Sequence, residues 1–190
     1  MAGLAVPKLK RREPFERIAF YGPMASGKSY AARYLVDGGN FVRVGFADKL
    51  KALAYDLYGI QDKNGIGRKF LQEFSDDCKK WDPDLFIKHF LYKVRAIEEG
   101  HNSPKIICDD LRYLREAKAL KKNGFTLIRV NCDEVVRANR ISKLYPNLDI
   151  AQTQHQSETE FSLIDSLTDK SINSTDINVV LELEDILNHA

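Results

Sequence analysis

The residues most able to do chemistry lie at positions 22–29, which read G-P-M-A-S-G-K-S and complete the pattern G-x-x-x-x-G-K-[ST]. The glycines let the backbone curl so that successive N–H groups point toward an anion. Lys28 can place a point charge on terminal phosphates, and the Ser29 hydroxyl can ligate Mg²⁺. The alternative is an ordinary glycine-rich turn that opens a helix, so the flanking residues must decide between the two.

The segments on either side favour a phosphate loop. Residues 17–21 (R-I-A-F-Y) predict a short buried strand, and residues 30–36 (Y-A-A-R-Y-L-V) predict a helix. This strand–loop–helix setting is the one in which the motif binds phosphate, and the helix adds the positive end of its dipole. The residues expected to bind the phosphates of ATP are Gly22, Ala25, Ser26, Gly27, Lys28, Ser29 and Tyr30.

Two adjacent carboxylates are candidate metal ligands. Asp109 and Asp110 directly follow the apolar run 105–108 (K-I-I-C), which predicts a buried strand. A phosphate-loop protein needs a carboxylate near Mg²⁺. We therefore expect one of the pair, together with Ser29, to hold the ion, through a water. The alternative is that both aspartates cap the helix that follows.

Three arginines are candidates for stabilising transferred phosphate. Arg112 follows the same strand and should lie at the carboxyl edge of the sheet, where open α/β folds bind ligands. Arg137 and Arg140 are three residues apart on a predicted helix, so they share one face. Guanidinium groups suit the many negative charges of phosphoryl transfer, and with Lys28 these arginines are the candidate catalytic residues. A solvated helix face is the alternative for Arg137 and Arg140.

Composition sets limits on the class of protein. The net charge of +2 gives no general attraction to nucleic acid or membrane, and no apolar run approaches the roughly 20 residues of a membrane span. The three cysteines, Cys78, Cys108 and Cys132, share no metal-binding spacing and suit a reducing cytoplasm. Residues 1–14 are basic and carry no secretory signal, so they predict a solvated, flexible leader before one domain at 15–190.

Strand-like and helix-like segments alternate along that domain, which predicts an α/β fold with a parallel sheet. The predicted strands are 17–21, 41–46, 105–108 and 126–131. The predicted helices are 30–36, 47–59, 68–79, 84–99, 114–123 and 134–144. The tail is ambiguous, because 177–183 has strand propensity but follows a capping sequence, S-T-D. We favour a short strand at 171–173 and then a helix.

Taken together, these segments resemble the deoxynucleoside monophosphate kinases of bacteriophages, within the wider nucleoside monophosphate kinase group. The phosphate loop is shared with many nucleotide-binding proteins, whereas D-x-R…E-A together with R-x-x-L-Q and a later H-x-S-E is far more selective. Besides the loop, the matching pieces are F-A-D-K-L-K (46–51), G-R-K-F-L-Q (67–72), W-D-P-D-L-F (81–86), D-L-R-Y-L-R-E-A (110–117), I-R-V (128–130), H-Q-S-E (155–158) and I-N (172–173).

The resemblance implies a three-layer P-loop kinase fold, with a five-stranded parallel sheet between helices. It also implies Mg²⁺-assisted transfer of the γ-phosphoryl group of ATP to a deoxynucleoside monophosphate. Region 47–100 would bind the acceptor, and region 137–160 would be a lid carrying Arg137 and Arg140. Relatives often pair through the helices that flank the sheet, so a homodimer in the cytoplasm, the host's if the protein is viral, is expected.

Eight residues are therefore candidates for binding the acceptor. Trp81 either stacks on a base or packs partly buried, and Arg129 in the I-R-V segment either joins the site or faces a carboxylate. The sequence after Arg140 matches the family less well, and no second pair of lid arginines can be aligned there. The acceptor candidates are Asp48, Lys51, Arg68, Gln72, Trp81, Arg112, His155 and Glu158.

Two other functions share the phosphate loop. A P-loop kinase for another small acceptor, such as dephospho-coenzyme A or a sugar acid, would differ only around Asp48, Arg68 and Trp81. A nucleotide-dependent switch would need a water-positioning residue and an effector surface, and the sequence offers neither. The supply of arginines beyond the loop instead favours a second anionic substrate.

Overall fold

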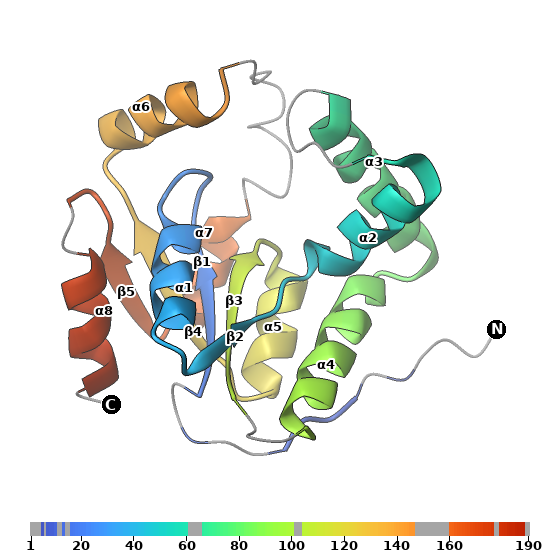
Figure 1. Ribbon diagram of the computed structural model, residues 1–190, viewed down its shortest axis with the longest axis horizontal. Coiled ribbons are helices and arrows are strands. Elements are labelled where there is room, and N and C mark those ends of the chain that lie inside the picture. Colours follow the sequence, from blue (N-terminus) through green and yellow to red (C-terminus); the bar gives the residue numbers. More distant parts are fainter. Residues whose placement is uncertain are drawn as a thin grey trace.

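In the computed structural model, the protein is built on a parallel sheet of five strands (Figure 1). The structure describes residues 5, 7–10, 13, 16–60, 66–100, 104–146, 160–176 and 179–188. The strands are β1 (Arg17–Tyr21), β2 (Phe41–Arg43), β3 (Lys105–Leu111), β4 (Thr126–Asn131) and β5 (Lys170–Asn173), in the spatial order β2-β3-β1-β4-β5. This confirms the predicted α/β class and the five-stranded parallel sheet.

Helices cover both faces of the sheet because every strand connection is a crossover. On one face, α1 (Lys28–Asp37) and α8 (Val179–Asn188) bury Ala31, Leu35 and Leu183 against the strands. On the other face lie α4 (Leu85–Glu98), α5 (Leu114–Lys122) and the short α7 (Phe161–Ile164), which continues into the 3-10 turn η3 (Asp165–Leu167). The result is the predicted three-layer arrangement.

Three further helices stand around the carboxyl edge of the sheet. They are α2 (Ala47–Tyr58), α3 (Ile66–Trp81) and α6 (Glu134–Leu144). In Figure 1, α6 and α3 lie on opposite sides above the sheet, with the loop between β1 and α1 below them. This edge is where parallel α/β folds bind ligands. Among the described residues, no helix is long and apolar enough to cross a bilayer.

Two strands have different lengths from those predicted. β2 ends at Arg43 instead of residue 46, because the N–H groups of Gly45 and Phe46 donate to the side chains of Asp48 and Asp110 and not to a neighbouring strand. β3 continues past Cys108 to Leu111, which pairs with Tyr21 of β1. Asp109 and Asp110 therefore lie within the strand and not after it.

Residues near both ends of the described chain pack against the core. The favoured assignment of a short strand followed by a helix is confirmed, because β5 spans Lys170–Asn173 and α8 begins at Val179 and packs Val179 and Leu183 onto the sheet. Within residues 1–14, Leu9 packs against the core and the carbonyl of Lys10 accepts a hydrogen bond from the buried Arg17, while a flexible leader stays a prediction. The Lys10 side chain is exposed, so charge faces solvent while the backbone follows the fold.

Candidate active site

The loop between β1 and α1 has a backbone that only glycine can adopt at two positions. Gly22 has φ +138°, and a Cβ there would lie 2.6 Å from the carbonyl oxygen of Val130. Gly27 has φ +95°, and a Cβ would lie 2.9 Å from Oγ of Ser174. The two glycines therefore allow both the curl of the loop and its close contact with β4 and the end of β5.

Lys28 is held inside this curl. Its Nζ donates to the carbonyl oxygens of Gly22 at 2.7 Å and Pro23 at 2.6 Å, and the side chain is buried. Since α1 begins at Lys28, the ammonium lies beside the positive end of the helix dipole. Ser26, within the loop, is also buried, and its carbonyl oxygen accepts a hydrogen bond from the Ser174 hydroxyl. The arrangement concentrates positive potential within one turn of backbone, as an anion site requires.

The two candidate metal ligands have separate roles. Asp109 is buried and its Oδ2 accepts a hydrogen bond from the Ser29 hydroxyl at 2.7 Å. Asp110 instead accepts from the N–H groups of Phe46 at 3.0 Å and Ala47 at 3.1 Å, at the start of α2. Asp109 therefore faces the phosphate loop, whereas Asp110 caps the start of α2 and not the helix that follows β3, which the alternative interpretation expected.

Ser29 and Asp109 form a small oxygen donor set that suits Mg²⁺. Mg²⁺ binds one or two protein oxygens and completes its shell with water and substrate phosphates. Within the described ranges, no group of three or more His, Cys, Asp or Glu side chains could hold a metal ion. The donor set fits an ion that arrives with its nucleotide, and does not form a closed protein cage.

Arg43 connects this pair to α2 and was not among the predicted site residues. Its Nε donates to Oδ1 of Asp109 at 2.7 Å, and its Nη1 donates to Oδ1 of Asp48 at 2.6 Å. We call Arg43, Asp48, Asp109 and Asp110 the Arg43 cluster. Partial burial lowers the pKa of the Arg43 guanidinium, but the three aspartates outweigh this effect and raise it. The sequence offers one indication of this role: Arg43 ends a strand and therefore lies at the ligand-binding edge of the sheet.

Asp48 belongs to this cluster and does not line the cavity. Besides Arg43, it accepts hydrogen bonds from Lys93 and from the N–H of Gly45. These partners outweigh its partial burial and lower its pKa to about 2. In this structure Asp48 therefore supports the turn before α2, and its assignment to the acceptor site stays a prediction.

A cavity of about 1070 Å³ lies at this edge of the sheet, and it extends from the phosphate loop to α3. Most of the predicted site residues line it, whereas Gly22, Ser26, Asp48, Trp81 and Arg137 do not. The predicted residues that line it are Ala25, Gly27, Lys28, Ser29, Tyr30, Lys51, Arg68, Gln72, Asp109, Asp110, Arg112 and Arg140.

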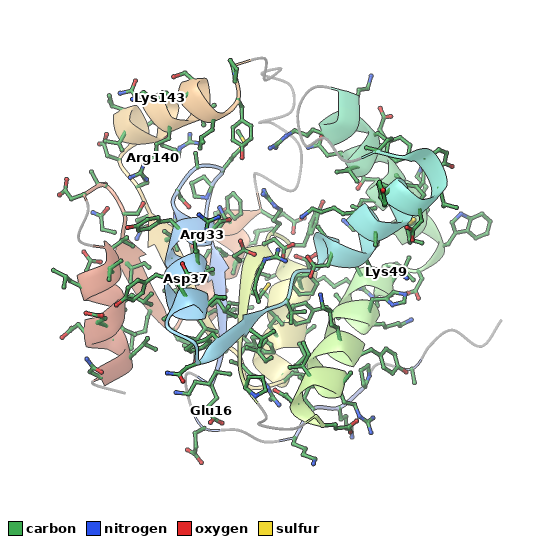
Figure 2. The ribbon with its side chains drawn as sticks, in the orientation of Figure 1. Glu16, Arg33, Asp37, Lys49, Arg140 and Lys143 are labelled. Carbon is green, nitrogen blue, oxygen red and sulfur yellow. The ribbon has the colours of Figure 1, made fainter. Side chains whose placement is uncertain are left out.

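One end of the cavity lies between the loop, α6 and the residues after β5. Arg140 donates to Oγ of Ser174 at 3.1 Å and to its carbonyl oxygen at 2.6 Å, and Figure 2 shows its side chain directed from α6 toward the rest of the domain. Arg137 pairs with Glu134 and donates to the carbonyl oxygen of Met24 at 3.4 Å. Both predicted lid arginines thus contact or flank the phosphate loop, although Arg137 lies outside the cavity lining.

The other end is lined by one face of α3. Arg68, Gln72, Ser75 and Lys79 follow one another at spacings of three or four residues, and all four face the cavity. The Arg68 guanidinium lies 5.1 Å from the ring centre of Tyr145, just after α6, so it connects the two helices that flank the cavity. Ser75 and Lys79 were not predicted, although their helical spacing from Arg68 and Gln72 is a usable signal.

Trp81 does not reach this face. It is the last residue of α3, and its side chain is 90% exposed. The helix therefore ends with the indole exposed to solvent, and the assignment of Trp81 to the acceptor site stays a prediction. Arg129 pairs with Asp165, which confirms that this strand residue faces a carboxylate. His155, Glu158 and most of the predicted lid at 137–160 lie outside the described residues.

Glu116 is a further cavity residue that the sequence interpretation missed, besides Arg43, Ser75 and Lys79. It lies in the first turn of α5, where one carboxylate oxygen accepts hydrogen bonds from the N–H groups of Arg112 and Tyr113. Burial raises the pKa of Glu116 to about 7 despite these hydrogen bonds. The D-x-R…E-A segment contains this glutamate, but the sequence of the segment does not indicate which backbone N–H groups Glu116 binds.

The protein is similar to known proteins in sequence and in fold. No family model matches the sequence. The chain is 25% identical over 142 residues to a protein of Acanthamoeba polyphaga mimivirus named "Putative deoxynucleotide monophosphate kinase", and this match covers 60% of the chain and 72% of that protein.

Solved structures share the fold at low sequence identity. TT1252 from Thermus thermophilus has a TM-score of 0.62 at 17% identity, with 94% of this chain and 98% of that one covered. Dephospho-CoA kinase from Campylobacter jejuni has a TM-score of 0.53 at 14% identity, with 92% of this chain and 96% of that chain covered. Shikimate kinase from Acinetobacter baumannii, in complex with shikimate, has a TM-score of 0.53 at 11% identity, with 91% of each chain covered. The fold is therefore that of the P-loop kinases, as predicted.

Proposed function

We propose that the protein is a kinase that transfers the γ-phosphoryl group of ATP, with Mg²⁺, to deoxynucleoside 5′-monophosphates. The observation that carries this proposal is a cavity with cationic side chains at both ends: Lys28 at one, and Lys51, Arg68 and Arg112 toward the other. A nucleotide hydrolase needs only the first group. The second group is suited to another anionic substrate.

The donor half of the reaction belongs to the phosphate loop. Its curled backbone and Lys28 would bind the β- and γ-phosphates, where the helix dipole adds to the positive potential. Mg²⁺ at Ser29 and Asp109 would neutralise charge that develops on the phosphate oxygens. Because phosphoryl transfer depends mainly on positioning and charge stabilisation, these groups supply most of what the donor side needs.

The acceptor half belongs to α2, α3 and the turn after β3. Arg68 and Arg112 would bind the acceptor phosphate, while Leu50, Leu71 and Phe86 line the cavity beside them and suit the flat face of a base. The name of the mimiviral relative supports a deoxynucleotide as acceptor. Arg137 and Arg140 would close over the transferred group from α6, which makes them lid residues in this proposal.

A coupled assay with ATP tests the proposal. All four deoxynucleoside monophosphates and their ribose counterparts are offered as acceptors, and we expect steady diphosphate production with at least one deoxynucleotide. The Lys28→Ala variant should remain folded yet lose turnover by on the order of 100-fold, because the lost charge acts mainly on the transferred phosphates. Turnover near wild type in that variant would remove the loop as the donor site.

The same assay separates the competing functions. If unlabelled deoxynucleotides fail to slow phosphorylation of dephospho-coenzyme A or a sugar acid, the protein is a kinase for that other acceptor. If ATP hydrolysis proceeds at a constant rate whatever monophosphate is added, the protein is a hydrolase or switch. Either outcome contradicts a deoxynucleotide kinase.

A further inference from the structure

The connection between β3 and α5 is short and faces the cavity. β3 ends at Leu111 and α5 begins at Leu114, so the connection consists of Arg112 and Tyr113. Both residues line the cavity. The direction in which the Arg112 side chain leaves the backbone therefore depends on how this two-residue turn is held.

One oxygen atom holds both residues of the turn. Oε2 of Glu116 accepts the N–H of Arg112 at 3.0 Å and the N–H of Tyr113 at 3.1 Å. Glu116 is only 6% exposed, so water cannot readily replace it as acceptor. We propose that Glu116 is a positioning residue, which orients Arg112 toward the substrate by using a single carbonyl-type oxygen and not its charge.

The charges around Glu116 explain why its own charge is dispensable. Burial, together with the nearby charge of Asp110 on β3, raises the pKa of Glu116 to about 7, while the two N–H hydrogen bonds and Lys79 on α3 oppose this rise. Glu160, which precedes α7, accepts the next N–H of the helix, that of Leu114, at 3.0 Å. Near neutral pH the Glu116 carboxyl is therefore partly protonated, and either form keeps an oxygen that can accept the two N–H groups.

The turn is also held by a residue of α3. The Lys79 ammonium lies 3.8 Å from the ring centre of Tyr113, a cation–π contact that joins α3 to the turn. The face of α3 that carries Arg68 and Gln72 is thus tied to the residue next to Arg112. Loss of the Glu116 oxygen should free the Arg112 end of this connection while leaving the Lys79 contact to anchor Tyr113.

Two substitutions separate the oxygen from the charge. Glu116→Gln keeps an oxygen that can accept both N–H groups, whereas Glu116→Ala leaves them without an acceptor. For the acceptor deoxynucleotide, we expect kcat/KM within about threefold of wild type in Glu116→Gln and at least tenfold lower in Glu116→Ala. Because the charge of Glu116 is not used, kcat/KM of the wild type and of Glu116→Gln should follow the same pH dependence between pH 6 and 8.

A double-substitution cycle tests whether the effect passes through Arg112. In an Arg112→Ala background, Glu116→Ala should lower kcat/KM by no more than about twofold, because nothing is left to orient. A purely structural role would lower thermal stability and leave the cycle additive. Additive losses, or a Glu116→Gln variant as inactive as Glu116→Ala, would overturn the proposal.

This inference rests on the proposed function, since Arg112 is taken to bind phosphate, so a second readout is independent of activity. Hydrogen–deuterium exchange of the amides in 112–116 should accelerate in Glu116→Ala and stay near wild type in Glu116→Gln. Unchanged exchange in Glu116→Ala would refute the positioning role. The predicted exchange pattern in a protein that phosphorylates no deoxynucleotide would instead refute the proposed function alone.

Discussion

Replacing Gly22 by alanine should destabilise the protein through one identifiable contact. The φ of +138° costs a residue with a Cβ about 1–3 kcal/mol. The added Cβ would lie 2.6 Å from the carbonyl oxygen of Val130, which belongs to β4 and cannot retreat without disturbing the sheet, and such overpacking costs about 1–3 kcal/mol more. We therefore expect Gly22→Ala to lower the free energy of unfolding by about 4 kcal/mol.

Gly39 offers a matched control. It also has a positive φ, of +82°, but a Cβ there would meet nothing within 4 Å. Gly39→Ala should therefore cost only the backbone strain, about 1–2 kcal/mol. Urea unfolding of both variants, followed by circular dichroism, gives the difference directly. Equal losses of stability would show that the loop is not wedged against β4 and would refute this description of its curl.

Three further substitutions test the parts of the site separately. Arg68→Ala should raise the Michaelis constant of the acceptor much more than that of ATP, and equal effects in steady-state kinetics would remove Arg68 from the acceptor end. Arg43→Met should lower the free energy of unfolding by about 2 kcal/mol, since two charge-assisted hydrogen bonds to Asp109 and Asp48 are lost. The control Lys93→Met, a half-exposed partner of Asp48, should cost less than 1 kcal/mol in the same urea titration. Because the folded pKa of Glu116 is raised from 4.5 to about 7, its contribution is complete below pH 4.5 and is lost as the pH rises through 7. The free energy of unfolding of the wild type should therefore fall by about 3 kcal/mol relative to that of Glu116→Gln between pH 4.5 and 8, as urea titrations at the two pH values would measure.

The parts of the site that the sequence predicts are those encoded by neighbouring residues. The loop at 22–29 is predictable because its glycines, Lys28 and flanking elements are contiguous. Arg112 is predictable because the end of a buried strand marks the ligand edge of a parallel sheet. The acceptor face of α3 is predictable in part, since Arg68 and Gln72 carry the helical spacing that Ser75 and Lys79 continue.

The parts that the sequence does not predict depend on contacts between distant segments. Arg43 acquires its role only when β2 lies beside β3, which brings it to Asp109, 66 positions away. The division of labour between Asp109 and Asp110 depends on where α2 begins in space. Trp81 illustrates the converse: an aromatic residue near a candidate site suggests burial or stacking, yet the end of a helix can direct it to solvent.

The most direct test of the whole account is a crystal structure with ADP or a non-hydrolysable ATP analogue and Mg²⁺. We predict the β-phosphate within the curl at 22–29, the Lys28 ammonium turned from the carbonyls of Gly22 and Pro23 toward phosphate oxygen, and the ion beside Ser29 and Asp109. A nucleotide bound elsewhere, with Lys28 still donating to those two carbonyls, would contradict it.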